Sequence, residues 1–491
     1  MKLPAEIYSV SSVRNIDQAA INDAGISGYS LMMRAGKATV DAAMEIYPDA
    51  RRWQVICGTG NNAGDGFVVA RLAAELGIAV SVITVSSAEK LGGDAATAYM
   101  DFAALGGVLA EFEGNLDAEA DLLFDGLLGS GLERPVEGRF AELVGAVNAH
   151  PAPVVALDIP SGIHGDTGEI LGTAIDADLT VTFVGLKSGL FLNSGPERIG
   201  GLRFSGLDIP DECRKGESPI MRRIDDDVVS RSLPPRRRGA HKGDFGHVLV
   251  IGGGPGMPGA VRICGEAALR CGAGLVSIAT HPSHSALIPI GRPELMCHGI
   301  DSVEQVKPLI EKATVVAIGP GLGTSDWAKS LLAVALASDR PIVADADALN
   351  LIADGVSRDG SWILTPHPGE AARLLGSTSG EVQGDRRAAL AALKQKLGGT
   401  IVLKGSGTLI SSARSAPWLC SAGNPGMASP GMGDALTGII ASLLGQGLSE
   451  ELAAVVGVQI HAQAGDRAAI GGERGLIVSD LLSEIRQEAN R

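Results

Sequence analysis

The chain has 491 residues, and because a single hydrophobic core stops growing at about 250–300 residues, two domains are predicted. Hydrophobic residues make up 45% of the chain and charged residues 20%, while 67 glycines and few aromatic residues favour α/β layers joined by glycine-rich loops. The net charge of −15 argues against a nucleic-acid-binding or anionic-membrane-binding surface, so neither partner is expected.

Other features of the composition favour a cytoplasmic enzyme. The six cysteines include no C-x-x-C pair, which indicates reduced thiols. The first residues, MKLPAEIYSV, lack the apolar region of a signal peptide, and no run of ~18 apolar residues occurs in the sequence. The basic segment PPRRRGAHKG at 234–243 is short and isolated, which favours a connecting role over a nucleic-acid patch. The oligomeric state stays open, with a homo-oligomer among the options.

The first half of the chain alternates apolar segments of strand length with helical segments. WQVIC at 53–57 is typical of a buried strand, and GFVVARLAAELG at 66–77 predicts a helix that ends at a glycine. Additional helices are expected within residues 9–46. Further strands are predicted at 79–85, 121–125, 153–158 and 179–184. This alternation predicts a doubly wound sheet with helices on both faces.

A polar, proline-containing segment precedes a second βα series. Residues 213–235 are predicted to form a linker between a domain at 1–212 and a domain at 236–491. In the second domain a helix is expected at 258–272, and TIVLKGSGTLI at 400–410 predicts a strand followed by a tight turn. Long helices are expected within 432–488. The other predicted strands are 247–253, 275–280, 315–320, 341–347 and 362–367.

Four loops of the first domain follow predicted strands and carry polar side chains. They contain Asn61, Asn62 and Asp65; Asp125 with Gly129 and Gly131; Asp158 with Ser161; and the GLKSG segment at 185–189. Loops after parallel strands gather at one edge of a sheet, where open α/β proteins bind ligands. Their carboxylate, amide and hydroxyl oxygens suit a hard cation. Turn formation and helix capping would explain any one of these loops alone, but not all four together.

The loop at 58–66, GTGNNAGDG, departs from the usual dinucleotide fingerprint. Gly58 and Gly60 match G-x-G-x-x-G, but the third glycine, Gly64, comes one position late. The acidic residue, Asp65, lies within the loop instead of about 20 residues further along. The loop therefore has the character of a phosphate-binding loop without the pattern of a redox-cofactor site.

A glycine-rich loop in the second domain predicts phosphoryl-transfer chemistry. GNPGMASPGMG at 423–433 leads into a predicted helix whose first turn carries Asp434. Loop N–H groups and the helix dipole favour a transferring phosphoryl group, and a nearby carboxylate can accept the proton of an attacking hydroxyl. Helix capping alone would explain Asp434 but not the glycines. Asp345 and Asp347 either cap the end of a strand or contact a metal-bound phosphate.

The motifs of the first half resemble a known domain. LMMRAG at 31–36, GNNAGDGFVVAR at 60–71, DGLLGSGL at 125–132 and LDIPSG at 157–162 resemble the Rossmann-like epimerase domain of bifunctional NAD(P)H-hydrate repair enzymes. The resemblance implies a catalytic role for Asp158 and potassium ligands at Asn62, Asp125 and Ser161. It also implies contacts with hydrated NADH or NADPH by Asn61, Asn62, Ala63, Gly64, Asp65, Gly129, Ser130, Gly131, Leu132, Glu133, Arg134, Pro135 and Asp158.

The second half resembles the ribokinase-like, ADP-dependent NAD(P)H-hydrate dehydratase domain of the same enzymes. The similarity rests on HKGDFGHVLVIGGGPG at 241–256, AIGPGLG at 317–323, TPHPGEAARLLG at 365–376 and the loop before Asp434. It implies catalysis by Asp434, ADP as co-substrate and Mg²⁺ with the nucleotide. The implied ADP contacts are Lys404, Gly405, Ser406, Gly407, Thr408 and Gly433, and the implied hydrate contacts are Ala260, Gly321, His367 and Asp434.

Together the two domains predict a metabolite-repair enzyme. The first would interconvert the R and S epimers at C6 of the hydrated nicotinamide, and the second would dehydrate the S epimer with ADP as phosphoryl donor. The alternative is a ribokinase-like kinase of a small vitamin alcohol with an N-terminal ligand-binding module. The sequence leaves open the preference for ADP or ATP and for NADH or NADPH, the route of epimerisation and any channelling.

Overall fold

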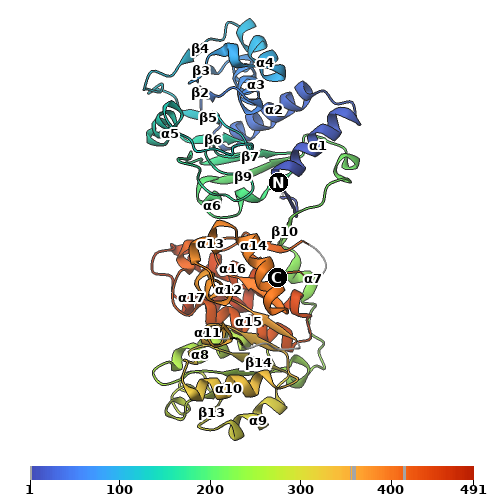
Figure 1. Ribbon diagram of the computed structural model, residues 1–491, viewed down its shortest axis with the longest axis vertical. Coiled ribbons are helices and arrows are strands. Elements are labelled where there is room, and N and C mark those ends of the chain that lie inside the picture. The colour runs from blue at the N-terminus through green and yellow to red at the C-terminus, as the bar shows by residue number, and fades with distance from the viewer. Residues whose placement is uncertain (1–2, 354, 356–360, 413–415) are drawn as a thin grey trace. The chain divides into compact units, whose positions relative to one another are not determined.

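The computed structural model describes residues 3–353, 355, 361–412 and 416–491, and it divides into two compact units, Met1–Arg222 and Arg223–Arg491 (Figure 1). The division lies inside the segment predicted as a linker. That segment is structured, however, because it contains strand β10 (Met221–Arg223) and helix α7 (Val228–Ser232). Val228 and Val229 are buried in the core of the second unit, so the mostly polar segment 213–235 contains a short apolar stretch that packs against this unit.

The first unit contains a parallel seven-stranded sheet in the order β4-β3-β2-β5-β6-β7-β9. The chain adds strands outward from β2 in one direction and from β5 in the other, so the topological switch point lies between β2 and β5. The strands are β2 (Arg52–Cys57), β3 (Ala79–Thr84), β4 (Leu109–Glu111), β5 (Leu122–Gly126), β6 (Val154–Leu157), β7 (Leu179–Phe183) and β9 (Gly201–Ser205).

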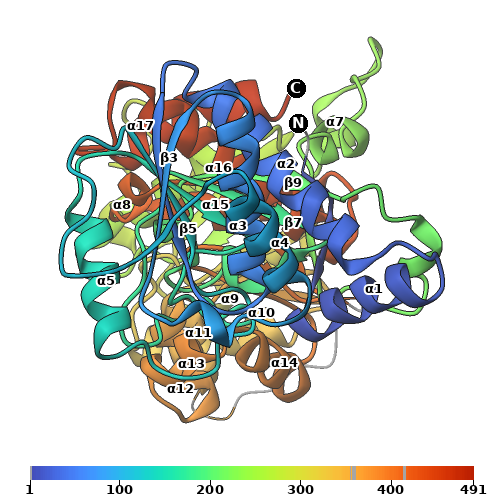
Figure 2. The ribbon, with the colours of Figure 1, turned by 90° about the horizontal axis from the view of Figure 1, so that it is seen from above.

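Helices cover both faces of this sheet, because its buried strands present apolar residues alternately to each side. Val55 of β2 packs in the core on the side of α2 (Gly28–Ile46), α3 (Asn61–Glu75) and α4 (Gly93–Ala104). Ile56 packs in the core on the opposite side with α5 (Arg139–Ala149). Figure 2 shows α2, α3 and α4 together on one side of the strands and α5 on the other.

A small sheet completes the first unit near its N-terminal helix, α1 (Val10–Asn22). In it β1 (Glu6–Tyr8) pairs in parallel with β8 (Leu186–Lys187) and antiparallel with β10. A short helix, α6 (Gly195–Arg198), precedes β9. The helices expected within 9–46 are confirmed as α1 and α2.

The second unit has a longer sheet in the order β13-β12-β11-β14-β15-β16-β17-β18-β19. The strands from β13 to β17 are parallel, whereas β17, β18 and β19 form antiparallel pairs. The bounds are β11 (His247–Ile251), β12 (Leu275–Thr280), β13 (Met296–Gly299), β14 (Val315–Ile318), β15 (Ile342–Ala344), β16 (Trp362–Leu364), β17 (Thr400–Leu403), β18 (Thr408–Ile410) and β19 (Trp418–Cys420).

One face of this sheet packs against a large hydrophobic core, formed with α8 (Pro258–Arg270), α15 (Met432–Gly445), α16 (Glu450–Ala468) and α17 (Val478–Glu488). Gly438 of α15 permits its close packing on α8, because a Cβ there would lie 2.0 Å from the Cys264 carbonyl oxygen. The remaining helices are α9 (Val303–Lys312), α10 (Asp326–Leu336), α11 (Asp347–Ala353), α12 (Pro368–Leu375), α13 (Ser379–Gly384) and α14 (Arg386–Leu397).

The predicted α/β class is confirmed, with two differences in detail. The helix expected at 66–77 begins at Asn61, so Asn61–Asp65 form its first turn and are not a loop. The short strands β4, β9, β13 and β19 were not predicted, because strands of three to five residues show little periodicity. Among the described residues, no helix is both long and apolar enough to cross a membrane.

Candidate active sites

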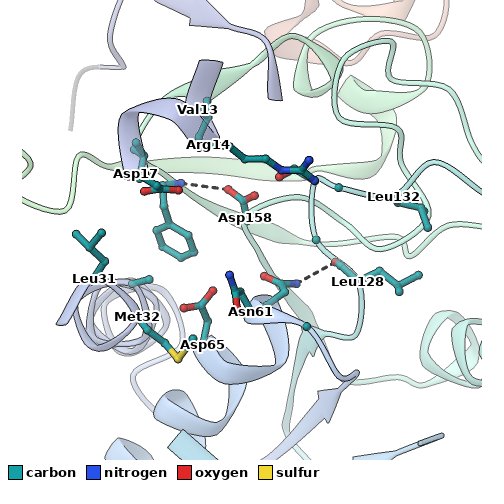
Figure 3. A pocket seen from close by; sticks show the side chains of 18 of the residues that line it. Val13, Arg14, Asp17, Leu31, Met32, Asn61, Asp65, Leu128, Leu132 and Asp158 are labelled. Carbon is teal, nitrogen blue, oxygen red and sulfur yellow. Dashed lines mark hydrogen bonds between the residues drawn. The ribbon is translucent and has the colours of Figure 1, made fainter. Parts of the chain in front are cut away.

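A cavity of about 1210 Å³ lies at the switch point of the first unit (Figure 3). It is lined by α1, the first turn of α3, the loop at 127–134, Asp158 and Lys187. Small-molecule sites typically occupy about 300–1,000 Å³, so this cavity has room for a ligand of dinucleotide size.

Two glycines shape the segment between β2 and α3 at this cavity. Gly58 lets the loop after β2 approach the loop after β5, because a Cβ there would lie 2.0 Å from the Leu127 carbonyl oxygen. Gly60 is the N-cap of α3 and provides no side-chain hydrogen bond to the first turn. The first N–H groups of α3 are therefore not capped by a side chain and face a site where a ligand phosphate would satisfy them.

Asp158 is held by a buried lysine at one side of the cavity. The Lys187 side chain is 1% exposed, and its ammonium forms an ion pair with Asp158. Lys187 also donates hydrogen bonds to Thr182 Oγ1 (3.1 Å) and the Phe183 carbonyl oxygen (2.9 Å). Asp158 has a φ of 67°, a left-handed conformation that is unusual outside glycine and concentrates at functional positions. The position of Asp158 is thus fixed by its surroundings.

Two further carboxyl groups, Asp17 and Asp65, converge on the same space from α1 and α3 (Figure 3). Neither forms a hydrogen bond or ion pair with a residue that the structure describes. Burial raises the pKa of Asp17 to about 6, with Lys187 opposing this shift and Asp158 adding to it. Burial and the carboxylates of Asp158 and Asp17 raise the pKa of Asp65 well above its usual value. The cavity therefore contains carboxyl groups that titrate over different pH ranges, as acid–base chemistry requires.

A separate oxygen cluster lies beside the cavity where β5 and β6 end. Asp125 is fully buried and accepts hydrogen bonds from Ser161 Oγ (2.6 Å), Ser161 N (2.7 Å) and Leu127 N (3.1 Å). Asn62 donates to the Leu128 carbonyl oxygen (2.9 Å), which also accepts from Ser161 Oγ (3.1 Å). Burial raises the pKa of Asp125 to about 6 against the opposing hydrogen bonds from Ser161 and Leu127. No Lys, Arg or His in the described part of the chain pairs with this carboxylate, so its donor set and uncompensated charge suit a cation.

Most residues predicted to contact the first ligand line this cavity. They are Asn61, Asn62, Asp65, Gly129, Ser130, Gly131, Leu132, Glu133, Arg134 and Asp158. Ala63, Gly64 and Pro135 do not line it; Ala63 is 1% exposed, and Gly64 packs against Met32. Residues 61–65 form the first turn of a helix, and in this turn Gly64 faces Met32 of α2 and Ala95 of α4.

The cavity residues that the sequence analysis missed include three charged ones, Arg14, Asp17 and Lys187, which lie close to Asp158 or on the helix beside it. Arg14 and Asp17 are three positions apart on α1, a spacing that places both on one helix face. Lys187 lies in the GLKSG segment that was noted only as a loop. The available signal for it was a charged residue three positions after the predicted apolar strand at 179–184.

The site of the second unit is organised by a buried ion pair. Lys404 Nζ lies 2.6 Å from Asp345 Oδ1, and Thr437 Oγ1 donates to Asp345 Oδ2 over 2.9 Å. Burial opposes ionisation of Asp345, but the Lys404 ammonium and hydrogen bonds from Lys404, Thr365 and Thr437 outweigh it and lower the pKa of Asp345. The sequence analysis gave two possible roles for Asp345, capping the end of a strand or contacting a metal-bound phosphate. In the structure its carboxylate links the end of β15 to Lys404 and to Thr437 of α15.

Asp434 stands beside this pair in the first turn of α15. It forms no hydrogen bond or ion pair with a described residue. Burial and the nearby Asp345 carboxylate raise the pKa of Asp434 to about 7, although Lys404 opposes the shift. Gly431, the N-cap of α15, has a φ of 90° and provides no side-chain hydrogen bond to the first turn. The first N–H groups of α15 can therefore bind an anion. They lie next to the Asp434 carboxyl group, which can exchange a proton near neutral pH.

The other residues that the sequence analysis named for this site are His367, Ala260, Gly321 and Asp347. His367 caps α12 by accepting from Gly369 N (3.0 Å), and its Nε2 lies 3.4 Å from Glu370 Oε1. Glu370 in turn lies 3.8 Å from Lys404 Nζ, which connects His367 to the ion pair. Gly321 adjoins Ala260, since a Cβ at Gly321 would lie 3.1 Å from the Ala260 Cβ. The Asp347 carboxylate accepts a hydrogen bond from the Gly323 N–H (2.7 Å).

The predicted nucleotide loop, residues 404–408, is the turn between β17 and β18. A Cβ at Gly433 would lie 3.3 Å from Lys404 Nζ, so Gly433 and the start of this loop are neighbours. Glu370 and Thr437 take part in the network but were missed by the sequence analysis. They look like ordinary helix residues until the strands bring Asp345 and Lys404 together.

The fold and these two sites define an α/β protein that joins a doubly wound, dinucleotide-binding unit to a kinase-like unit for phosphoryl transfer. Residues 248–487 match the family described as NAD(P)H-hydrate dehydratase, and residues 28–189 match the YjeF-related protein N-terminus. The chain belongs to the family of bifunctional NAD(P)H-hydrate repair enzymes, as its motifs predicted.

Membership rests on similarity over the whole chain. This chain is 47% identical over 485 residues to the bifunctional NAD(P)H-hydrate repair enzyme Nnr of Coxiella burnetii, and the similarity covers 99% of both chains. Identity to the Escherichia coli Nnr is 41% over 491 residues, covering 100% of this chain and 95% of that one.

Solved structures confirm the ribokinase-like fold of the second unit. The ADP/ATP-dependent NAD(P)H-hydrate dehydratase of Bacillus subtilis, co-crystallised with ATP/Mg²⁺, has a TM-score of 0.50 and 30% identity, covering 54% of this chain and 97% of that one. A ribokinase-like superfamily protein of Enterococcus faecalis has a TM-score of 0.51 and 30% identity, covering 55% of this chain and 95% of that one.

Proposed function

We propose that this chain repairs hydrated NADH and NADPH in two steps, with epimerisation at C6 in the first unit and nucleotide-dependent dehydration of the S epimer in the second. The observation that carries the proposal is the raised pKa of Asp434 at the start of α15, beside the Asp345–Lys404 pair, in a chain that resembles bifunctional repair enzymes from end to end. A sensor or scaffold would not need an unpaired carboxyl group at this position.

The dehydration follows from the chemistry of the C6 hydroxyl, which is a poor leaving group. Asp434 takes the hydroxyl proton while the oxygen attacks the β-phosphorus of ADP, and AMP departs. The C6–O bond then breaks with loss of phosphate, the ring nitrogen stabilises the resulting cation, and loss of the C5 proton restores the double bond. We assign stabilisation of the transferring phosphoryl group to Lys404 and the N–H groups at 431–433; the Lys404–Asp345 pair and the uncapped start of α15 support this assignment.

For the nucleotide, we assign ADP contacts to Lys404, Gly405, Ser406, Gly407, Thr408 and Gly433. Support comes from the nearness of Gly433 to Lys404 and from the turn that presents residues 404–408. Hydrate contacts are assigned to Ala260, Gly321, His367 and Asp434. The relative from Bacillus subtilis crystallised with ATP/Mg²⁺ supports entry of Mg²⁺ together with the nucleotide here as well.

For the epimerase we assign acid–base roles to the cavity carboxyl groups. Loss of hydroxide and ring opening both require a proton to be delivered to and removed from the region of C6. Asp65, whose pKa is strongly raised, supplies a protonated acid, whereas Asp158 paired with Lys187 supplies a fixed carboxylate. Asp17, whose pKa is raised to about 6, is the third carboxyl group of the cavity and can accept a proton near that pH.

We further propose that Asn62, Asp125 and Ser161 hold a potassium ion, with the Leu128 carbonyl oxygen as an additional ligand. The buried, unpaired Asp125 carboxylate and the oxygen-rich surroundings support this assignment. When bound, the ion would supply a fixed positive charge beside the cavity that favours an anionic dinucleotide.

The test uses a mixture of both NADH-hydrate epimers, followed at the absorbance of reduced nicotinamide, with ADP and then ATP. We expect recovery beyond the fraction present as the S epimer, faster than spontaneous epimerisation. Recovery that stops at that fraction would contradict the epimerase. No recovery with either nucleotide would contradict the dehydratase and favour the kinase alternative.

A further inference from the structure

Arg386, the first residue of α14, lies buried beneath the turn at residues 404–408. Its side chain is 3% exposed. The guanidinium donates hydrogen bonds to the carbonyl oxygens of Leu403 (3.2 Å) and Lys404 (3.2 Å), and it also contacts that of Ser406. One side chain thus binds three carbonyl groups of a single short turn.

This arginine has no acidic partner among the described residues, and its Nε–H has no hydrogen-bond partner there. Burial lowers the pKa of Arg386 to about 10, so the group remains charged at neutral pH. A buried charge without a counter-ion is costly, and carbonyl dipoles compensate only part of this cost. Such a group is retained where its geometry has a function.

The orientation of the peptide groups suggests that function. In a trans peptide the C=O and the following N–H point in opposite directions. Because the carbonyl groups of Lys404 and Ser406 point toward Arg386, the N–H groups of Gly405 and Gly407 must point away from it. Neither N–H donates to a described residue, and Gly405 is exposed. The φ angles of 139° at Gly405 and 67° at Gly407 show why glycine is required at both positions.

We propose that Arg386 is a positioning residue for the nucleotide: it fixes the turn so that the Gly405 and Gly407 N–H groups face acceptor atoms of ADP. The proposal rests on the proposed function, because it takes the turn at 404–408 as the ADP-binding loop. Arg386 itself does not contact the reacting atoms. Its loss should therefore weaken nucleotide binding with little effect on the chemical step.

The experiment compares Arg386→Met, Arg386→Lys and a matched control, Arg387→Met. Arg387 is the next residue of α14 and makes no hydrogen bond to the turn. Each full-length variant is assayed for KM of ADP, KM of the S hydrate and kcat, and epimerase activity of the same chain reports its integrity. Direct binding of ADP is measured in parallel.

We expect Arg386→Met to raise KM and Kd for ADP roughly tenfold, since removing a charged donor leaves carbonyl groups unsatisfied. KM for the hydrate, kcat and epimerase activity should stay within about twofold. Arg386→Lys should recover part of the loss, and Arg387→Met should change nothing.

Unchanged ADP binding in either Arg386 variant would overturn the proposal, as would equal losses in both KM values and kcat. If Arg386→Met fails to fold, Arg386→Lys decides, because a lysine keeps the charge but cannot bind three carbonyl groups in the same way. Absence of nucleotide-dependent activity in the unaltered protein would count against the proposed function instead.

Discussion

At the scale of single residues, surroundings give four aspartates different properties. Asp158 and Asp345 are paired with lysines, Asp125 accepts hydrogen bonds in a cluster without a cationic side chain, and Asp434 has no partner among the described residues. Charge pairing favours the ionised form, whereas burial without a counter-charge favours the protonated form. The unpaired, half-buried Asp434 is therefore the group best suited to exchange a proton near neutral pH.

Replacing Asp434 with Asn should lower dehydratase kcat by about 10²–10⁴-fold, the usual contribution of a general base. Because the pKa of Asp434 is about 7, the unaltered enzyme should lose kcat/KM as the pH falls below 7, where the carboxylate becomes protonated. A pH–rate profile with ADP at saturation checks this. A profile that stays flat down to pH 5 would contradict the role of Asp434, and epimerase activity serves as the control.

Lys187→Met should change the pH dependence of the epimerase. Lys187 lowers the pKa of Asp17, so its removal should move that pKa above 6 and shift the acidic limb of the profile to higher pH. Asp17→Asn should abolish the limb. Stopped assays of epimer interconversion between pH 5 and pH 8 measure both effects, and an unshifted limb in Lys187→Met would remove Asp17 from the acid–base set.

At the scale of elements, each site gathers residues from the ends of several strands and helices. In the first unit, Asp125 lies in the last two residues of β5, Ser161 follows β6 and Asn62 belongs to the first turn of α3. In the second, α15 packs closely on α8, which sets Asp434 and Ala260 near the starts of adjacent helices. Parallel strands with a reversal in their order produce this convergence.

Potassium should stabilise the first unit, and more strongly at pH 7.5 than at pH 5. The pKa of Asp125 is raised to about 6, so its buried carboxylate lowers stability above that pH unless a cation compensates it. At a concentration 100 times its Kd, a bound ion adds about 2.7 kcal/mol, or a rise in Tm of roughly 5 °C or more. Thermal unfolding followed by loss of epimerase activity tests this.

The matched comparisons are N-methylglucamine at equal ionic strength and the Asp125→Asn variant. Neither should show the potassium-dependent rise in Tm. An equal rise in Asp125→Asn would place the ion elsewhere.

At the scale of the whole molecule, the chain contains two compact units, each with its own sheet, core and candidate site. The residues assigned to epimerisation all lie in the first unit, and those assigned to dehydration all lie in the second. Each activity should therefore depend only on the integrity of its own unit.

An equimolar mixture of Asp158→Asn and Asp434→Asn proteins should repair both epimers, because the S hydrate can diffuse from one chain to another. Each variant alone should fail, the first on the R epimer and the second on both. Recovery of reduced nicotinamide from an epimer mixture with ADP provides the measurement. A mixture that stops at the S fraction would show that both sites must lie in one chain.

The amino-acid sequence was enough to predict the α/β class, the family and the loops that contribute to the sites. These depend on local features: strand and helix periodicity, glycines at turns and short motifs such as those around Asn62 and Asp434. Such features act over a few residues, so they remain legible without the fold. The same locality explains the error at α3, because asparagine and glycine suit a loop and the first turn of a helix equally well.

Which charged groups contact each other could not be predicted without the fold. Asp345 pairs with Lys404, 59 positions away, and with Thr437, 92 positions away, while Asp158 meets Lys187 across 29 positions. Arg386 and Asp17 show no motif, and their importance follows from burial beneath a turn and beside a cavity. Charge pairing and burial depend on strand order and helix packing, which are long-range properties, and they shift the pKa values of Asp17, Asp345 and Asp434.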